Sequence, residues 1–142
     1  MEVFTNNGLG KIHILRLDPG DDVLESIEAF IARENICGGV VLSGIGTLDC
    51  CVLHMVMTTD YPPVEHFERW ENVALELASL SGVIANGAPH LHTVVSDSKA
   101  AYAGHLERGC RILYLGEVVI AEIEGFNSAR VPNAQGIRML AP

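Results

Sequence analysis

Residues 37–48 have the sequence CGGVVLSGIGTL, an apolar and β-branched run set between glycines. A short apolar run bounded by turn-forming residues is typical of a strand that is buried on both faces. A second strand is expected over residues 50–57, after a turn near Asp49. The central run therefore predicts a buried strand, and the segments on either side of it indicate the rest of the fold.

The segment before this run predicts a strand, a turn and the clearest helix of the chain. Residues 11–17 alternate as a strand does, with Ile12 and Ile14 on one face and His13, Leu15 and Leu17 on the other. The turn-forming sequence DPGD follows at residues 18–21. A helix is expected from Val23 to Asn35, with apolar residues at helical spacing and Asp21 or Asp22 as its N-cap.

The segment after the central run is dominated by strand patterns. Its expected elements are residues 72–84 as helix or strand, 89–96 as a short strand, 97–104 as a loop, 111–124 as the longest strand with an interruption at Gly116, and 137–140 as a last strand. One early helix followed by many strands predicts an α+β fold with a largely antiparallel sheet covered on one side. We expect residues 1–142 to form a single domain.

The charge balance argues against a protein that binds nucleic acid over a broad surface. The chain has 18 acidic and 9 basic residues, which gives a formal net charge of −9. Phosphate binding depends on clustered lysines and arginines, and here the basic residues are spread along the chain. We therefore expect no nucleic-acid partner in the absence of a basic partner protein.

The N-terminal residues, the apolar runs and the cysteines predict the cellular compartment of the protein. The first residues lack the basic and apolar regions of a signal peptide, and no apolar run approaches the ~20 residues that span a bilayer. A cytoplasmic protein without membrane contact is expected. Cys37, Cys50, Cys51 and Cys110 are predicted to be small buried hydrophobic residues in a reducing compartment, the alternative being a thiol metal ligand or a redox role.

Two of the six histidines have the spacing of metal ligands. His90 and His92 lie in the strand pattern of residues 89–96, so both imidazoles project from one face. His105 follows after the expected loop and reaches the pair if the loop folds back. Three imidazoles suit an open tetrahedral site for zinc, iron, copper or nickel. The alternative is a polar pair at a subunit interface or a hydrogen-bonding cluster.

The other histidines and the nearby carboxylates are less specific. His13 and His66 have the patterns of ordinary core or surface residues, and His54 lies in an otherwise apolar strand. Glu117 and Glu122 project from opposite faces of a regular strand, so at most one of them is expected at the histidines. Such a carboxylate could orient a ligand histidine. Glu117 is the candidate general base if the site is catalytic.

Five motifs occur in an order that resembles the plants-and-prokaryotes-conserved (PPC) domain. They are GVVLSGIG at 39–46, ELASLSG at 76–82, PHLH at 89–92, GHL at 104–106 and EVVI at 117–120. The chain is similar to a stand-alone prokaryotic member over nearly its whole length. The resemblance implies a compact α+β fold, a homotrimer, and a metal site at His90, His92 and His105.

Prokaryotic members of this family are commonly labelled as predicted DNA-binding proteins, and this chain fits that label poorly. Plant members place the domain after basic AT-hook motifs, and no Arg-Gly-Arg-Pro hook occurs here. Val73 and Ala74 stand where plant domains have Gly and Arg, so plant partner contacts are not expected.

The functional prediction is a homotrimeric module with a three-histidine site for a divalent metal ion, zinc being the expected ion, and with room for a small ligand. The alternatives are a DNA-associated regulator, a metal-dependent hydrolase-like enzyme without an identified substrate, and a purely structural assembly domain.

Overall fold

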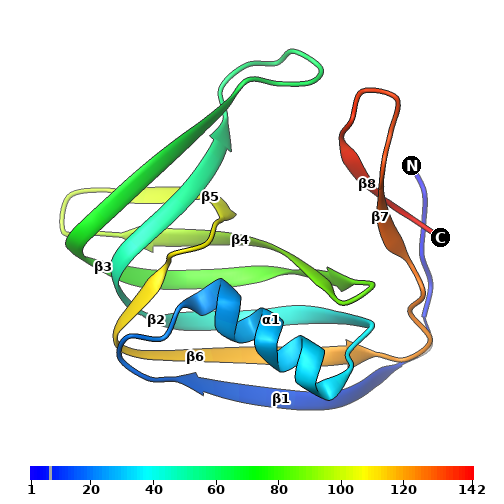
Figure 1. Cartoon of the computed structure of the whole chain (residues 1–142), viewed down its shortest axis with the longest axis horizontal. Coiled ribbons are helices and arrows are strands. Elements are labelled where there is room, and N and C mark those ends of the chain that lie inside the picture. Colours follow the sequence, from blue (N-terminus) through cyan, green and yellow to red (C-terminus); the bar gives the residue numbers. More distant parts are fainter. Residues whose placement is uncertain (7) are drawn as a thin grey trace.

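The helix α1, Val23–Glu34, lies across one face of a sheet in the computed structural model, which describes residues 1–6 and 8–142 (Figure 1). It buries Val23, Ile27 and Ile31, as its apolar spacing predicts. Asn35 ends the helix in the left-handed region, with φ 55°, which asparagine tolerates. Asp22 occupies the N-cap position but forms no side-chain capping hydrogen bond.

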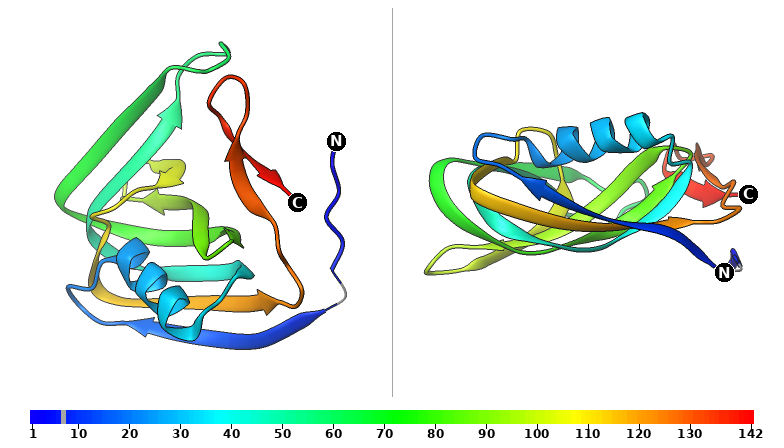
Figure 2. Two further views of the ribbon diagram at one scale, coloured as in Figure 1. Left: turned by 45° about the vertical axis from the view of Figure 1, so that its right-hand side comes forward. Right: turned by 90° about the horizontal axis from the view of Figure 1, so that it is seen from below.

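Six strands form one antiparallel sheet in the order β1–β6–β2–β3–β4–β5. Their bounds are β1 Leu9–Leu17, β2 Gly38–Val56, β3 Glu65–Ala85, β4 Ala88–Ser96, β5 Ala101–Leu106 and β6 Arg111–Ile123. A separate hairpin is made by β7, Ala129–Pro132, and β8, Arg138–Ala141. One helix on a mostly antiparallel sheet confirms the predicted α+β class. In the view from below, the helix covers one side of the sheet (Figure 2).

The long strands β2 and β3 extend past the other strands of the sheet (Figure 1). Near its end, β2 pairs with β5 through Leu53↔Leu106 and His54↔His105, in addition to its pairing with β3. Strands β2, β3, β4 and β5 are therefore joined in a closed ring. This closure brings residues of β2 next to residues of β5, which are far away in the sequence.

The expected turn near Asp49 is wrong, because β2 runs through it as one strand of 19 residues. The register shifts between Leu48 and Cys50, so the strand is irregular there without ending. The carboxylate of Asp49 accepts two hydrogen bonds of 2.9 Å from Arg111 on β6. The Arg111 guanidinium holds the pKa of Asp49 below its usual value. A turn-forming residue is thus kept in a strand by a bidentate ion pair.

The structure also decides three expectations about the strands β3, β5 and β6. Residues 72–84, which fitted either helix or strand, belong to β3. The expected loop over 97–104 is too long, because β5 already begins at Ala101. Strand β6 continues through Gly116, where an added Cβ would lie 2.7 Å from Cδ1 of Ile112. That glycine marks a close approach, and the register with β2 shifts between Gly116 and Ile112 although β6 continues as one strand.

The core lies between α1 and the sheet, and its largest fully buried side chains are leucines and isoleucines. Cys51 and Cys110 belong to it, with their sulfurs 3.9 Å apart, which confirms their predicted role as small hydrophobic residues. Cys37 is exposed and Cys50 is half-buried, so the same prediction is wrong for these two. Cys37 comes just before β2 begins. Cys50 directly follows the register shift between β2 and β3.

Within the described residues, no helix is both long enough and apolar enough to cross a membrane, since α1 has only 12 residues.

Candidate metal centre

Four histidines from three strands meet on one face of the closed ring. His92 of β4 is in register with His105 of β5, and His105 is in register with His54 of β2. His90 lies two residues before His92, so it shares the same face of β4. The structure therefore brings together the three predicted residues and adds His54. We call these four residues the histidine cluster.

The remaining histidines lie outside the cluster. Nε2 of His13 lies 2.8 Å from the Glu122 carboxylate, and its ring packs edge-on against Phe30 of α1 at 4.9 Å. His66 is exposed and lies 3.0 Å from Glu68. Both have the ordinary roles that the sequence indicates.

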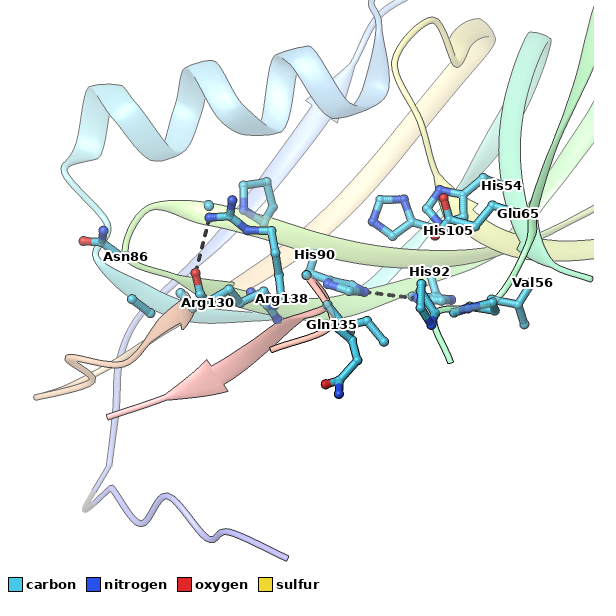
Figure 3. Close-up of a pocket in the computed structure, with 18 residues that line it drawn as sticks. His54, Val56, Glu65, Asn86, His90, His92, His105, Arg130, Gln135 and Arg138 are labelled. Atoms are coloured by element: carbon cyan, nitrogen blue, oxygen red, sulfur yellow. Dashed lines mark hydrogen bonds and ion pairs between the residues drawn. The ribbon is translucent and has the colours of Figure 1, made fainter. Parts of the chain in front are cut away.

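The rings of His90, His92 and His105 are arranged around a common space (Figure 3). His90 and His92 are stacked, with centroids 5.3 Å apart, and their Nε2 atoms are 3.3 Å apart. The ring of His105 stands edge-on to both, with centroids at 4.9 and 5.5 Å. The two Nε2 atoms face one another at a distance that fits either a hydrogen bond between the rings or two donors on one ion.

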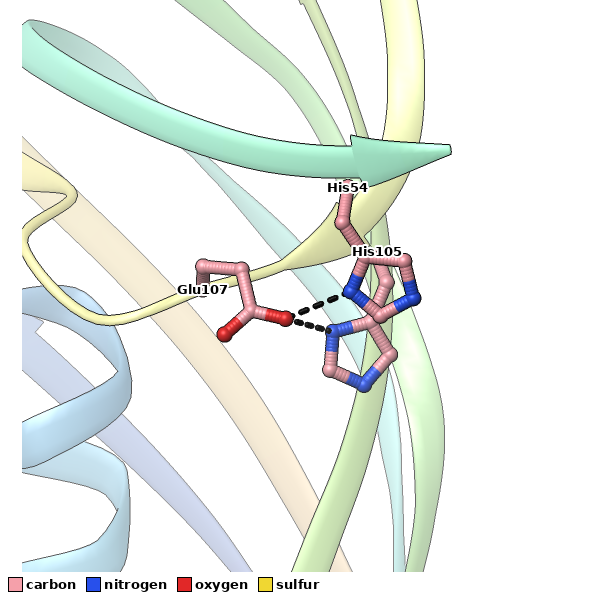
Figure 4. A group of neighbouring side chains, drawn as sticks. All are labelled: His54, His105 and Glu107. Atoms are coloured by element: carbon pink, nitrogen blue, oxygen red, sulfur yellow. Dashed lines mark hydrogen bonds and ion pairs between the residues drawn. The ribbon is translucent and has the colours of Figure 1, made fainter. Parts of the chain in front are cut away.

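Glu107, one residue after β5, contacts two members of the cluster. One of its carboxylate oxygens lies 2.6 Å from Nδ1 of His54 and 3.2 Å from Nδ1 of His105 (Figure 4). The contact to His105 lacks hydrogen-bond geometry, so this buried Nδ1 has no hydrogen-bond partner. In both rings the second nitrogen is turned away from Glu107 (Figure 4). A carboxylate on Nδ1 is the usual device that fixes the tautomer in which Nε2 binds a metal.

Two ligand sets are candidates, and among the described residues only one of them, without His90 and His92, has all its donor atoms within 4.8 Å of one another. The ligand atoms of His54, His105 and Glu107 lie within 4.8 Å of one another, so they form one candidate set. Two donors on a tetrahedral zinc ion, each at ~2.0–2.1 Å, are separated by about 3.3–3.4 Å. The 3.3 Å between Nε2 of His90 and Nε2 of His92 fits this value. The 2.6 Å between Glu107 and His54 is instead the length of a charge-assisted hydrogen bond.

The protonation states favour cation binding by the predicted set. Burial first, and then Arg130 and the neighbouring histidines, together lower the pKa of His90 to about 4. Burial and then the charge of His54 lower the pKa of His105, against the opposing effect of Glu107. Both imidazoles are therefore neutral at pH 7, which is the form that binds a metal.

The cluster forms part of the wall of a cavity of about 820 Å³ (Figure 3). The cavity is bounded by the ends of β2 and β3 with the loop between them, by the start of β4, and by the β7–β8 hairpin. Asn133, in the turn of that hairpin, donates a 2.6 Å hydrogen bond to the hydroxyl of Tyr61 in the β2–β3 loop. Arg130 and Arg138 of the hairpin also line the cavity.

The two predicted carboxylates are not at the cluster. Glu117 is exposed on β6, where it is in register with Arg16 and Ile45, and it does not line the cavity. Glu122 contacts His13 instead of a cluster histidine. The expectation that Glu117 could act as a general base at the site is therefore wrong, and Glu107 takes the orienting position.

Residues 4–124 match the model of the Plants and Prokaryotes Conserved domain, abbreviated PCC in that model. The chain belongs to this family. The curated relatives include the bifunctional protein GlmU of Synechococcus sp. (strain JA-3-3Ab), which is 32% identical over 125 residues. That match covers 87% of this chain and 19% of GlmU, so the chain spans about a fifth of the length of the relative.

Solved structures of similar proteins share the fold over almost the whole chain. A metal-containing protein from Archaeoglobus fulgidus has a TM-score of 0.83 and 26% identity, and the match covers 100% of both chains. A putative DNA-binding protein from Bacteroides thetaiotaomicron has a TM-score of 0.79 and 21% identity, covering 96% of each chain. The second likeness shows the fold alone.

The match to the family model ends before the β7–β8 hairpin, so Arg130 and Arg138 lie outside it. Sequence reasoning missed both arginines, as well as His54 and Glu107. Glu107 follows His105 by two residues, so the strand period of two could have indicated it. His54 could have been found only from the pairing of β2 with β5, which places it beside His105. No periodicity in the sequence indicates that pairing.

Proposed function

We propose that the protein is a homotrimeric metal-binding module in which His90, His92 and His105 hold a divalent ion, with zinc as the expected ion. The observation that carries the proposal is the 3.3 Å separation of the His90 and His92 Nε2 atoms, which fits two donors on one tetrahedral ion. The buried Nδ1 of His105 adds to it. A cation on the other nitrogen of that ring would strengthen its attraction to Glu107 and offset the cost of the unpaired atom.

The bound ion would supply Lewis acidity and a coordination position that is open toward the cavity. The chain's own residues have separate roles: Glu107 is hydrogen-bonded to His54 and places its charge 3.2 Å from Nδ1 of His105, and the cavity admits a small ligand. The similar protein from Archaeoglobus fulgidus, described as metal-containing, supports this proposal.

The direct test measures the metal content of protein purified without chelator, by elemental analysis, together with anomalous scattering from crystals at the zinc edge. We expect about one ion per chain, with the anomalous peak beside Nε2 of His90 and His92. Absence of metal after dialysis against zinc would overturn the proposal.

Replacing Glu107 with Gln should weaken metal binding without abolishing it. The loss of a carboxylate that orients a ligand typically reduces metal affinity by roughly 10–100-fold. Competition with a chromophoric chelator measures the change. Glu68→Gln is the matched control, because Glu68 pairs with His66 outside the cluster. If Glu107→Gln removed the metal completely, Glu107 would be a ligand, and the assigned ligand set would be incorrect.

The homotrimer is supported by apolar side chains on the sheet face opposite α1. Ile12 is 60% exposed, Ile14 76% and Ile45 48%. Cross-strand register places one row of residues on this face, from β1 to β4: Ile12, Ala121, Val40, Val83 and His90. The exposed isoleucines therefore share a face with the histidine cluster. A second copy that covered them would lie close to the site.

Replacing Ile14 with Asp should dissociate the trimer, because the exposed isoleucine would be exchanged for a charge in the proposed interface. Light scattering after size-exclusion chromatography should show the mass fall from that of three chains to that of one. Val131→Asp is the control, since Val131 is 51% exposed on β7, which belongs to the separate two-stranded hairpin and not to the six-stranded sheet. An unchanged mass of Ile14→Asp would contradict the assignment of the interface.

DNA binding is not supported as a second function. The net charge of −9 repels a phosphate backbone. The DNA-binding description belongs to a protein whose 21% identity carries only the fold.

A further inference from the structure

Two arginines in the cavity wall lack the partners that the other arginines have. Five of the seven arginines form ion pairs with carboxylates: Arg16, Arg33, Arg69, Arg108 and Arg111. Within the described part of the chain, Arg130 and Arg138 have no carboxylate within 4.0 Å, although acidic residues outnumber basic ones by two to one. Arg130 is half-buried and Arg138 is exposed, and both line the same cavity.

The hydrogen bonds of these arginines leave most of their donors free. Arg130 donates to the backbone carbonyl of Val83 at 3.5 Å, which is a long contact. Arg138 donates to the backbone carbonyl of Arg130 at 3.3 Å. Each guanidinium has five N–H donors, so several of them remain for a ligand. Burial also lowers the pKa of Arg130, yet a guanidinium stays protonated, so this partly buried charge favours an anionic partner.

The rest of the cavity does not supply that anion. Glu65 is the carboxylate among the lining residues, and it lies 3.9 Å from Nε2 of His54, on the cluster side. Figure 3 shows Arg130 and Arg138 on one side of His90, and His92, His105, His54 and Glu65 on the other. The rest of the lining includes prolines and alanines together with Val56 and Ile137.

We propose that the cavity binds a small molecule through an oxyanion, carboxylate or phosphate, which is held by Arg130 and Arg138 beside the histidine cluster. A guanidinium forms paired, charge-assisted hydrogen bonds with such groups. The apolar lining accommodates the body of the ligand. The site goes beyond the proposed metal module: it requires only the arginines and the cavity, so metal-free protein also tests it.

The test is isothermal titration calorimetry of the full chain at low ionic strength, with inorganic phosphate and with succinate as separate probes. Protein is used both metal-free, after treatment with chelator, and loaded with zinc. We expect binding to metal-free protein, and a loss of roughly ten- to hundredfold in affinity for Arg130→Ala and for Arg138→Ala. Binding of phosphate alone or of succinate alone would support the proposal and identify the kind of oxyanion.

Two further variants separate a binding role from a structural one. Arg69→Ala should bind as the wild type does, because Arg69 is exposed and paired with Glu71. Glu65→Gln should bind more tightly, since it removes the negative charge from the cavity wall while keeping the shape. A gain of affinity is not expected from a variant that damages the fold.

Several results would overturn the inference. It fails if neither probe binds at millimolar concentration to metal-free or zinc-loaded protein, or if the Arg130 and Arg138 variants bind as the wild type does. It also fails if binding requires zinc and is insensitive to both arginines, because the ion alone would then hold the anion. Failure of the metal proposal is measured separately, by the absence of metal in protein that still binds the probe.

Discussion

The variant in which both His90 and His92 are replaced by alanine should lose its metal, with the content falling from about one ion per chain to background. It removes the two donors whose Nε2 atoms lie 3.3 Å apart, and leaves His105 as a single imidazole of the predicted set. One imidazole does not retain a divalent ion through dialysis, because each ligand contributes to a binding free energy of ~10 kcal/mol or more in structural sites. Elemental analysis after dialysis against zinc measures the effect.

The controls for this variant use the other histidines. His66→Ala should keep the wild-type metal content, because His66 is exposed and pairs with Glu68. His54→Ala should keep most of it, since the assigned ligand set leaves His54 as an orienting neighbour of His105. If the double variant kept its metal and His54→Ala lost it, the ion would belong to His54, His105 and Glu107. Circular dichroism confirms that each variant is folded.

Gly82→Ala should be the most destabilising single substitution near the site. A Cβ at Gly82 would collide with the backbone carbonyl oxygen of His90 on the neighbouring strand. Backbone atoms in a paired strand cannot move aside as a side chain can, so we expect a loss of roughly 3 kcal/mol in the free energy of unfolding. Chemical denaturation of metal-free protein, at fixed protein concentration, measures the loss.

The same substitution should also weaken metal binding, since relief of the collision displaces the strand segment that carries His90 and His92. Gly8→Ala is the matched control, because a Cβ there would meet nothing within 4 Å. Equal unfolding free energies for the two alanine variants would show that β3 and β4 do not approach as closely as described.

The sequence predicted the elements whose patterns are local. The helix beginning at Val23 has a clear apolar stripe, and Ile12 and Ile14 alternate with the buried side of β1. The turn predicted at Asp49 was wrong, because turn propensity is a local property. The ion pair that overrides it is made with Arg111, which belongs to a strand far along the chain.

The candidate site was predictable to the extent that it lies within one strand. His90 and His92 share a face through the period of two of a strand, and the resemblance to a known family added His105. Glu107, two residues after His105, could have been predicted by the same period, whereas His54 could not, because it meets His105 through the pairing of β2 with β5. Arg130 and Arg138 come from a hairpin outside the family match. Cross-strand register and chain topology decide these neighbours, and one sequence contains neither.

The pairing of β2 with β5 has a consequence for the local opening of the sheet. Only two residue pairs are in register there, Leu53↔Leu106 and His54↔His105. Separating two strands that pair over so few residues costs less free energy than separating the longer strand pairs around them. Transient local opening should therefore begin between β2 and β5. Such opening separates His54 from His105, directly at the site. An ion or ligand that binds only the form in which β2 and β5 are paired therefore lowers the population of the open form, by mass action.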